Sequence, residues 1–363
     1  MDCENKKIKN SQSSGVSCNA PNKLWRITLD TNPEDCNFHC IMCEEHSEYS
    51  KFKDKLKERS CGAGGWRRRM PVEWLDRIMA DAAAIGVTDV IPSTMGEPLL
   101  YQGIDEFFDA AERHGLKINL TTNGSFPGKP IEKWAKIIIP MTRDVKISLN
   151  GARKETSEAI MRGSDFDAQI CHIKVLLDER NRHFNKTGWY CSITLQLTFM
   201  QNNMGELADI VKMACELGAD RIKGHHLWTH FDEIKGLSMK ASPESIAQWN
   251  EYVRQANSAQ KTYARPLPNG KLLRLENITP LEEDRGEYIP EEAECPFLGR
   301  ELWISATGRI SPCCCPDDKR RTLGDFGHFP GTTLSEVLNS ELYKALLADY
   351  KTREVCRTCN MRR

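Results

Sequence analysis

The sequence has no long apolar run, no excess of charge of either sign and no apolar core near its N-terminus. No run approaches the roughly 20 apolar residues that a helix needs to cross a bilayer, so a membrane-spanning protein is not expected. Lysine and arginine together number 50 against 51 aspartates and glutamates, which gives a net charge of −1. This balance favours neither nucleic acid nor a membrane surface as the partner. The start, MDCENKKIKNSQSSG, is too polar for a signal peptide, so we expect a cytoplasmic protein.

Cysteine is the residue type that is unusually frequent, with 15 copies in 363 residues. Disulfides are disfavoured in the cytoplasm, where clustered cysteines more often bind metal or carry out redox chemistry. Nine of the cysteines fall into two groups, one near each end of the chain: Cys36, Cys40 and Cys43, and then Cys295, Cys313, Cys314, Cys315, Cys356 and Cys359. The grouping predicts two metal or redox centres.

A repeated order of helix, glycine and strand runs from Leu24 to about residue 240. Strands are expected in six stretches: LWRITLD, VTDVIPS, KINLTT, DVKISLN, SITLQLTF and RIKGHH. Gly86, Gly115 and Gly218 each follow a helical pattern, where a left-handed residue commonly ends a helix. Such units build a parallel sheet, and six of them fit either an open sheet or a partial (β/α)6 TIM-like barrel of the α/β class, because the eight repeats of a closed barrel are not there. The chemistry is then expected at the carboxyl ends of the strands.

The helix–strand pattern stops after about residue 240. We expect a tail at 1–23, the partial barrel at 24–240, a helical linker region at 241–294 and a small cysteine-rich α+β domain at 295–363. In the last domain a hairpin (LWIS, ATG, RISP) holds two cysteines. One helix (LSEVLNSELYKALLADY) then leads to a terminal Cys-x2-Cys.

The first cysteine group, in CNFHCIMC, supplies three thiolates in a loop that follows the first strand. Soft thiolates select zinc, Cu(I) or iron–sulfur clusters. A structural zinc site needs four ligands, and His39 inside the motif is the candidate for the fourth. Three cysteines on a four-iron cubane instead leave one iron open, as a catalytic cluster requires. The spacing and position resemble the Cys-x3-Cys-x2-Cys motif of the radical S-adenosylmethionine (radical SAM) superfamily.

The resemblance implies a SAM-binding [4Fe–4S] cluster on Cys36, Cys40 and Cys43 and reductive cleavage of SAM to a 5′-deoxyadenosyl radical. Three further stretches are similar to SAM-binding motifs of that family: a Gly-Glu-Pro turn after the second strand, a polar end of the fourth strand and an Arg-Gly pair beyond it. Met42 of the cysteine motif stands where members of that family often have an aromatic residue that packs near adenine. The implied SAM-binding residues are Gly96, Glu97, Pro98, Ser148, Asn150, Arg162 and Met42.

The second cysteine group resembles the SPASM and twitch domains that carry auxiliary iron–sulfur clusters. The resemblance implies one auxiliary [4Fe–4S] cluster, with Cys295, Cys313, Cys356 and Cys359 as ligands. Spacing alone leaves zinc as an alternative. Cys314 and Cys315 are surplus: one of them replaces Cys313 as a ligand, or they are thiols near the pocket, or they simply pack.

The predicted reaction is hydrogen abstraction from an unactivated C–H bond, leading to dehydrogenation with the auxiliary cluster as electron acceptor or substrate ligand. A small-molecule substrate is slightly favoured over a peptide, because only about 23 residues precede the first strand. The alternatives are a redox-neutral epimerase and a peptide-crosslinking enzyme; a non-catalytic zinc- or cluster-binding protein is a remote one. An epimerase needs a hydrogen donor, for which Cys61, Cys314 and Cys315 are the candidates. The electron donor is expected to be a flavodoxin or ferredoxin.

Two weaker signals have a functional and a structural interpretation. His225, His226, Trp228 and His230 follow the sixth strand, so they either shape the substrate pocket or pack beneath the second domain. The run Arg67–Arg69 either meets a phosphate or carboxylate or is solvated.

Overall fold

The computed structural model describes residues 24–51, 67–282, 291–315, 317–359 and 361–362. Within these ranges, nine strands form one sheet in the order β7-β6-β5-β4-β3-β2-β1-β8-β9. All neighbours run parallel except β8 and β9, which are antiparallel. The strands are β1 Arg26–Leu29, β2 Asp89–Ile91, β3 Lys117–Thr122, β4 Thr142–Ser148, β5 Ser192–Phe199, β6 Arg221–His226, β7 Arg274–Glu276, β8 Glu301–Ile304 and β9 Ile310–Ser311. The predicted α/β class with a partial barrel is confirmed.

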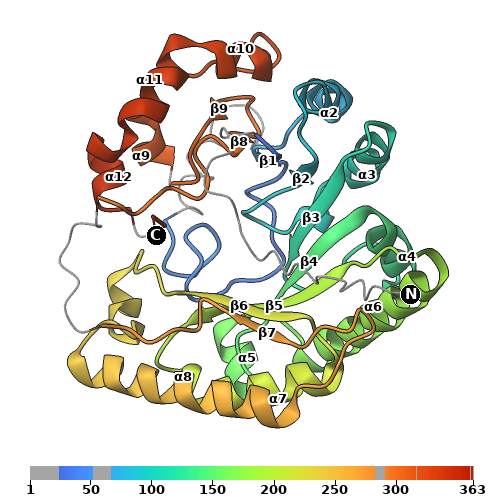
Figure 1. Cartoon of the computed structure of the whole chain (residues 1–363), viewed down its shortest axis with the longest axis vertical. Coiled ribbons are helices and arrows are strands. Elements are labelled where there is room, and N and C mark those ends of the chain that lie inside the picture. The colour runs from blue at the N-terminus through green and yellow to red at the C-terminus, as the bar shows by residue number, and fades with distance from the viewer. Residues whose placement is uncertain (1–23, 52–66, 283–290, 316, 360, 363) are drawn as a thin grey trace, which may run out of the picture.

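The helices of the barrel lie outside the curved sheet, whereas the cysteine-bearing loop after β1 lies on its hollow side (Figure 1). The α-helices up to the linker region are α2 Leu75–Ala84, α3 Ile104–Arg113, α4 Ile131–Met141, α5 Lys154–Ile160, α6 Phe166–Thr187, α7 Leu207–Leu217 and α8 Pro243–Tyr263. Short 3-10 helices are η1 Val72–Trp74, η2 Pro98–Leu100, η3 Met204–Glu206 and η4 Asp232–Leu237.

The strands alternate between an apolar face, which packs against the helices, and a polar face. Ile27 of β1, Val145 and Ile147 of β4, and Ile193 and Leu195 of β5 are fully buried in the main core. Burying each such side chain stabilises the fold by about 1.5–3 kcal/mol. The residues between them are polar, and they face the hollow of the sheet. The core therefore lies between the sheet and the helices, and polar side chains lie on the concave side of the sheet.

The helix ends in the crossovers behave as the sequence predicts. Gly86, Gly115 and Gly218 have φ values of 83°, 69° and 85°, in the left-handed region that glycine adopts without a steric penalty. Gly218 also closes α7 by donating its N–H to the carbonyls of Ala214 and Cys215. Each glycine turns the chain from a helix into the next strand.

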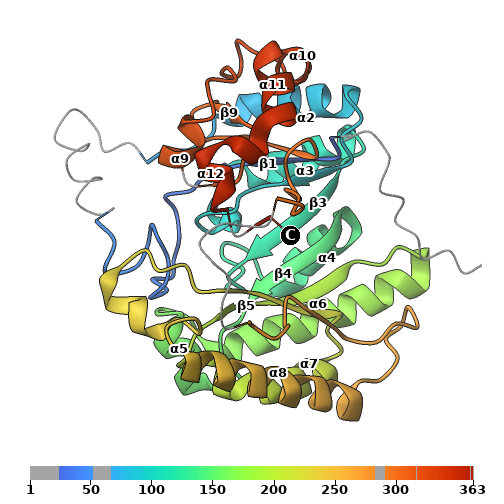
Figure 2. The same ribbon diagram turned by 60° about the vertical axis from the view of Figure 1, so that its left-hand side comes forward.

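The C-terminal segment joins the barrel sheet, because β8 pairs in parallel with β1 and the hairpin continues into β9. The remaining elements are α9 Asp317–Arg321, α10 Leu334–Asn339, α11 Glu341–Asp349, η5 Tyr350–Thr352 and α12 Glu354–Arg357 (Figure 2). The single helix expected after the hairpin is wrong: the chain breaks at Ser340, whose hydroxyl accepts a hydrogen bond from the N–H of Tyr343 and so begins α11 anew. Strand β7 lies in the stretch expected to be linker.

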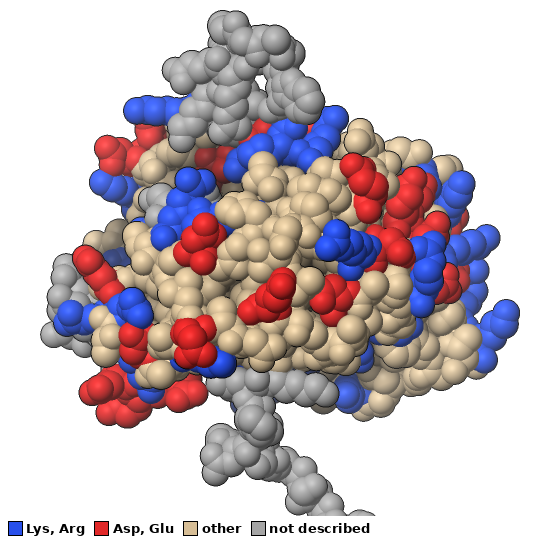
Figure 3. Space-filling model, turned by 90° about the horizontal axis from the view of Figure 1, so that it is seen from above, with Lys and Arg blue, Asp and Glu red and all other residues tan. Residues whose placement is uncertain are grey.

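Basic and acidic side chains are intermingled on the face seen from above (Figure 3), in keeping with the net charge of −1. No helix in the described part of the chain combines the length and the apolar character that crossing a bilayer requires.

Candidate functional site

The first cysteine group lies in the loop after β1, at the carboxyl ends of the strands. Cys36, Cys40 and Cys43 are all half-buried. The loop packs on a small apolar cluster that is separate from the main core. Its buried members come from the loop itself, from α5 and its end, and from the segments after β5 and β6: Phe38, Ile41, Ile160, Met161, Met200, Leu227 and Ile234. Cys36, Cys40 and Met42 pack against this cluster, which therefore supports the loop from one side.

Backbone hydrogen bonds hold the cysteine loop to the last residue of α5 and to the residues that follow it. The N–H of His39 donates to the carbonyl of Arg162 at 2.7 Å, and the N–H of Ile41 donates to the carbonyl of Ile160 at 3.0 Å. Gly163 has a φ of 89°, and a β-carbon there would lie 3.3 Å from the carbonyl oxygen of Asn37. The Arg-Gly pair therefore contacts the cysteine motif through its backbone, while the guanidinium of Arg162 forms an ion pair with Glu48.

The thiols of this loop accept hydrogen bonds from amide groups. Cys36 Sγ lies 3.4 Å from the backbone N of Phe38 and 3.8 Å from Nδ2 of Asn123, and Cys43 Sγ lies 3.4 Å from the N of His46. Burial raises the pKa of the Cys36 thiol to about 11 and raises the pKa values of Cys40 and Cys43 as well. Bound iron offsets that cost by holding thiolates, and N–H donors on the sulfurs are a recognised way of tuning a cluster. The donor set therefore fits an iron–sulfur cluster.

The two histidines near the motif are engaged elsewhere. His39 Nδ1 lies 3.3 Å from the carbonyl oxygen of His46, and His46 Nε2 lies 3.2 Å from the carbonyl oxygen of Pro33. Among the described residues, no three His, Cys, Asp or Glu side chains are arranged to hold a single metal ion. His39 therefore has one ring nitrogen, Nδ1, engaged with the protein backbone.

The Gly-Glu-Pro turn after β2 holds the start of the cysteine loop. Gly96 has a φ of 70°, and a β-carbon there would lie 2.5 Å from the carbonyl oxygen of Asn32 and 2.6 Å from that of Asp35. Only glycine fits such an approach. Pro98 follows as the first residue of η2.

The Glu97 side chain is fully buried and ties the ends of β2 and β3 together. It accepts hydrogen bonds from the hydroxyl of Thr122 at 2.8 Å and from the N–H of Asn123 at 2.7 Å. Burial raises the pKa of Glu97 to about 7, although these hydrogen bonds lower it. The structure shows Glu97 as a support of the site, and its contact with the SAM ammonium group stays a prediction.

At the polar end of β4, one of the two predicted SAM-binding residues forms a hydrogen bond within the protein. Asn150 is buried, and its side-chain oxygen accepts a hydrogen bond from the N–H of Thr198 at 2.8 Å. Ser148 is half-buried on the hollow side of the sheet. The predicted SAM-binding residues are thus brought to one end of the sheet, from the loop after β1, the turn after β2, the end of β4 and the end of α5.

The arginine run after residue 66 meets carboxylates of the protein itself. Asp35, which directly precedes Cys36, is buried and accepts hydrogen bonds from Arg67 Nη1 at 2.6 Å and from Arg69 Nε at 2.7 Å. Arg68 binds the buried Glu34 with its backbone N–H and its guanidinium. We call Glu34, Asp35 and Arg67–Arg69 the arginine clamp. Sequence reasoning named a carboxylate as one possible partner, but the charge pattern alone does not say which one.

The second cysteine group gathers around a cavity of about 30 Å³ between the β8–β9 hairpin and α12. All six cysteines of the group line it: Cys295, Cys313, Cys314, Cys315, Cys356 and Cys359. Two of the sulfurs accept backbone hydrogen bonds, Cys295 Sγ from the N–H of Leu298 at 3.3 Å and Cys313 Sγ from the N–H of Cys315 at 3.5 Å. Thiols from distant segments thus converge, as an auxiliary cluster requires.

Arg362 is a supporting residue that the sequence did not reveal. It is buried, and its guanidinium donates to the carbonyls of Ala293 at 3.0 Å and Cys356 at 3.1 Å. It therefore ties the segment before Cys295 to α12, which carries Cys356.

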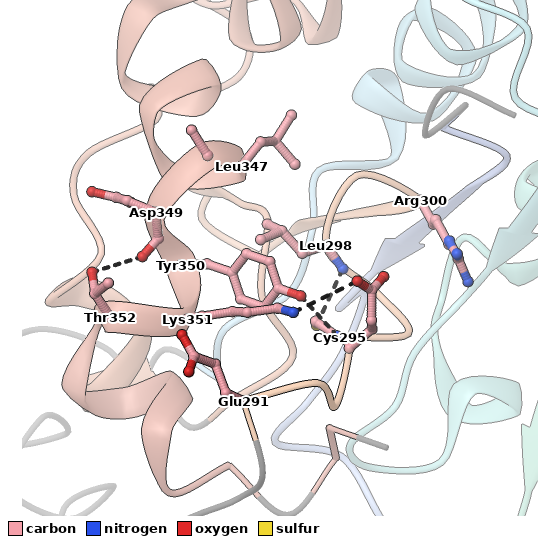
Figure 4. A pocket seen from close by; sticks show the side chains of 11 residues that line it. Glu291, Cys295, Leu298, Arg300, Leu347, Asp349, Tyr350, Lys351 and Thr352 are labelled. Carbon is pink, nitrogen blue, oxygen red and sulfur yellow. Dashed lines mark hydrogen bonds and ion pairs between the residues drawn. The ribbon is translucent and has the colours of Figure 1, made fainter. Parts of the chain in front are cut away.

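A larger pocket of about 480 Å³ adjoins the second cysteine group (Figure 4). Tyr350 reaches towards Cys295 there, and its hydroxyl oxygen accepts a hydrogen bond from the Cys295 N–H at 3.3 Å. Lys351 pairs with Glu294 at 3.7 Å on the same wall. The pocket is lined by side chains of both charges, and we assign it no ligand.

The two histidines that end β6, His225 and His226, point in different directions. His226 packs against Phe199 and Trp249, with ring centroids 5.4 and 4.8 Å away, and its Nδ1 is buried without a hydrogen-bond partner among the described residues. His226 is therefore a packing residue, but it packs against β5 and α8 and not beneath the domain expected at 295–363. His225 is exposed on the hollow side of the sheet. Cys61, the remaining candidate hydrogen donor, lies outside the described residues.

Comparisons with known proteins agree with this geometry. Residues 33–194 match the model of the Radical SAM superfamily, and residues 295–360 match SPASM, an iron–sulfur cluster-binding domain. A PqqA peptide cyclase of Methylobacterium nodulans is 24% identical over 283 residues, which cover 74% of this chain and 67% of that protein.

Two solved structures share the fold. Streptococcus suis SuiB bound to S-adenosylmethionine superposes with a TM-score of 0.60 at 16% identity, over 93% of this chain and 71% of that one. Native anSMEcpe with bound AdoMet and the Cp18Cys peptide superposes with a TM-score of 0.58 at 15% identity, over 93% of this chain and 86% of that one.

The fold, the two thiol groups and the two matched models define a radical SAM enzyme. The chain is a member of that superfamily that carries a C-terminal SPASM-type domain, and its cofactors are SAM and [4Fe–4S] clusters.

Proposed function

We propose that Cys36, Cys40 and Cys43 ligate the cluster that binds SAM, and that the enzyme uses the 5′-deoxyadenosyl radical to remove hydrogen from an unactivated C–H bond of a peptide. The observation that carries the proposal is the loop itself. It presents three half-buried thiols, while its two neighbouring histidines are engaged with backbone carbonyls. An iron that no protein side chain ligates is where SAM can bind.

The protein's own residues position the reactants. The Arg162 carbonyl and the Gly96–Glu97 turn fix the cysteine loop at the carboxyl ends of the strands. The predicted SAM contacts come from Gly96, Glu97, Pro98, Ser148, Asn150, Arg162 and Met42. Holding SAM and substrate together in a site that excludes water is the part of radical chemistry that a protein supplies.

Peptide is the favoured substrate because named relatives act on peptides or bind them. One curated relative is a peptide cyclase, and one structural neighbour was solved with a peptide bound. This reverses the slight preference for a small molecule, which rested on the length of the N-terminal segment. A reduced flavodoxin or ferredoxin is the proposed electron donor, and the cytoplasm the proposed compartment.

The proposed outcome is a two-electron oxidation, either dehydrogenation or formation of a crosslink. The cluster that Cys36, Cys40 and Cys43 would hold would supply the one electron that SAM cleavage needs, and the substrate would give up in total one hydrogen atom, one electron and one proton. Cys295, Cys313, Cys356 and Cys359 would hold an auxiliary cluster that could accept the electron that the substrate gives up. The proposal assigns the SAM-binding barrel to residues 24–240 and the auxiliary domain to residues 295–363.

Mass spectrometry tests the outcome on peptides encoded beside the gene. Incubation with SAM and reductant should yield a product that has lost two hydrogen atoms. A product whose mass is unchanged in ordinary water, but which contains deuterium when the reaction is run in heavy water, would instead show epimerisation. In that case Cys314 and Cys315, which line the auxiliary cavity, are the donors to replace first.

A further inference from the structure

The face of the sheet that turns away from the helices carries an ion-pair chain whose charged residues come from β4, β6 and β7, with β5 lying between β4 and β6. Asp144 and Lys146 of β4, Arg221 and Lys223 of β6 and Glu276 of β7 alternate with buried apolar residues such as Val145 and Ile222. Their side chains therefore share the hollow side of the sheet, because successive residues of a strand point to opposite faces.

The five charges are linked in the order Lys146–Asp144–Arg221–Glu276–Lys223. Lys146 Nζ lies 3.2 Å from Asp144 Oδ2, and Arg221 bridges Asp144 and Glu276, with Nη1 2.8 Å from Glu276 Oε2. Lys223 Nζ lies 2.8 Å from Glu276 Oε1. Three cations thus face two carboxylates, which leaves one positive charge in excess. The ammonium groups of Lys146 and Lys223, at the two ends of the ion-pair chain, each have one carboxylate partner within it. An ammonium group has three N–H donors, so each can form further hydrogen bonds.

Polar residues of β4 and β5 lie beside the two lysines that end the ion-pair chain. Lys223 is level with Gln196 of β5, and Gln196 is level with Ser148 of β4. The side-chain amide of Gln196 is half-buried and has no hydrogen-bond partner among the described residues. His225 is exposed and lies two residues beyond Lys223 along β6, nearer the carboxyl ends of the strands. Desolvation by the surrounding protein and the positive charge of Lys223 lower the pKa of His225, although its side chain is still accessible to solvent.

We propose that Lys146 and Lys223, with Gln196 and His225, bind an anionic group of the substrate, a carboxylate or a phosphate, on the hollow side of the sheet. The inference rests on the proposed function, because it concerns the substrate of that site. The excess charge calls for one counter-charge, and charge-assisted hydrogen bonds to an anion are the strong kind. The row also lies directly beside Ser148, so an anion held there places the rest of the substrate near SAM.

The test uses anions as probes of the reconstituted full-length enzyme. Thermal unfolding is followed against acetate and, separately, inorganic phosphate, at constant ionic strength set with chloride. The wild type should show a saturable rise in unfolding temperature. Lys223→Met and Lys146→Met should each raise the apparent dissociation constant about tenfold or more, since each removes a charge-assisted hydrogen bond. The probe that saturates at the lower concentration identifies the group as carboxylate or phosphate.

Two further variants make the outcome decisive. In both lysine variants the carboxylate left behind keeps its pairing with Arg221, so the sheet should stay intact. Glu276→Gln adds to the positive excess and should lower the dissociation constant. Lys344→Met removes an exposed lysine of α11 that pairs with Glu341, and it should bind the anions as the wild type does.

Three results would overturn the inference: no saturable shift in the wild type, an equal shift in all variants, or a rise in the SAM concentration needed for half-maximal 5′-deoxyadenosine formation in Lys223→Met. The last result would assign the site to SAM's own carboxylate. Anion binding is measured here without turnover. Failure of SAM cleavage in the wild type would therefore count against the proposed function and not against this site.

Discussion

The carbonyl oxygen of Asp35 accepts a hydrogen bond from the backbone N–H of Glu97 at 2.6 Å. This contact joins the residue before the first cysteine of the motif to the Gly-Glu-Pro turn. The cysteine loop and the Gly-Glu-Pro turn lie far apart in the sequence, but in the fold their backbones are hydrogen-bonded to each other. Because the turn contacts the loop so closely, the geometry of the cysteine loop depends on the conformation of the turn.

Gly96→Ala should displace the cysteine loop. A β-carbon at residue 96 would lie 2.5 Å from a backbone oxygen, in addition to the strain of a left-handed φ. Gly115→Ala is the matched control, because its φ of 69° is similar and nothing lies within 4 Å of the added carbon. The control should cost about 1–2 kcal/mol in urea unfolding, and Gly96→Ala should cost more and retain less iron. Equal losses in the two variants would contradict the account.

Asp35→Asn should loosen the arginine clamp. Burial alone raises the pKa of Asp35, but hydrogen bonds and charge from Arg69 and Arg67 lower it overall, so the buried carboxylate is ionised in the folded protein. Losing these charge-assisted bonds should cost roughly 1.5–3 kcal/mol and shorten the lifetime of the cluster in air, measured by loss of its brown absorbance. Asp76→Asn, at an exposed aspartate paired with Arg113, should change neither.

His226 should make the enzyme less stable in mild acid. Burial lowers the pKa of His226 to about 4, whereas an unfolded histidine has a pKa of about 6.5. As pH falls from 6.5 towards 4, the unfolded chain takes up a proton that the folded chain does not, so unfolding becomes easier by roughly 3 kcal/mol in total.

His226→Phe keeps a ring against Phe199 and Trp249 and should flatten that pH dependence in urea unfolding between pH 7 and 4.5. His230→Phe, at an exposed position, should keep the wild-type slope. An unchanged slope in His226→Phe would show that the imidazole is already protonated in the folded protein.

Cys313, rather than its two neighbours, should be the auxiliary ligand. The Cys313 sulfur accepts hydrogen bonds from the backbone N–H of Cys315 and from the thiols of Cys314 and Cys315. These hydrogen bonds lower the pKa of Cys313, so its thiolate is the most favoured of the three. Cys313→Ser should lose about half of the iron of a protein that binds two four-iron clusters. Cys314→Ser and Cys315→Ser should keep it. Iron loss in Cys314→Ser with full retention in Cys313→Ser would reverse the assignment.

Much of the fold follows from local pattern. Strand alternation and the glycines after helices depend on neighbouring residues, so the six barrel strands and the turns at Gly86, Gly115 and Gly218 could be read from the sequence. The cysteine motif could be recognised because its spacing is local too. The helix after the hairpin was predicted as one because its apolar pattern continues, but a serine at residue 340 can cap a new helix and does so.

What escaped prediction depends on contacts between distant residues. Strand β7 is short, and only its pairing with β6 makes it a strand. Nothing near Arg67 or Arg69 indicates Asp35 as their partner, and nothing near Arg362 indicates the carbonyl of Ala293. The ion-pair chain between Lys146 and Lys223 likewise exists only once β4, β6 and β7 lie in one sheet.

The central claim is that the thiols of Cys36, Cys40 and Cys43 hold the cluster that cleaves SAM. The most direct measurement is 5′-deoxyadenosine formation under anaerobic conditions, with iron, sulfide, reductant and SAM. It should compare the wild type with a variant that carries alanine at all three positions. The account predicts that the wild type forms 5′-deoxyadenosine and that the variant does not, although the variant still binds iron at its auxiliary cysteines. Equal formation by the two proteins would contradict it.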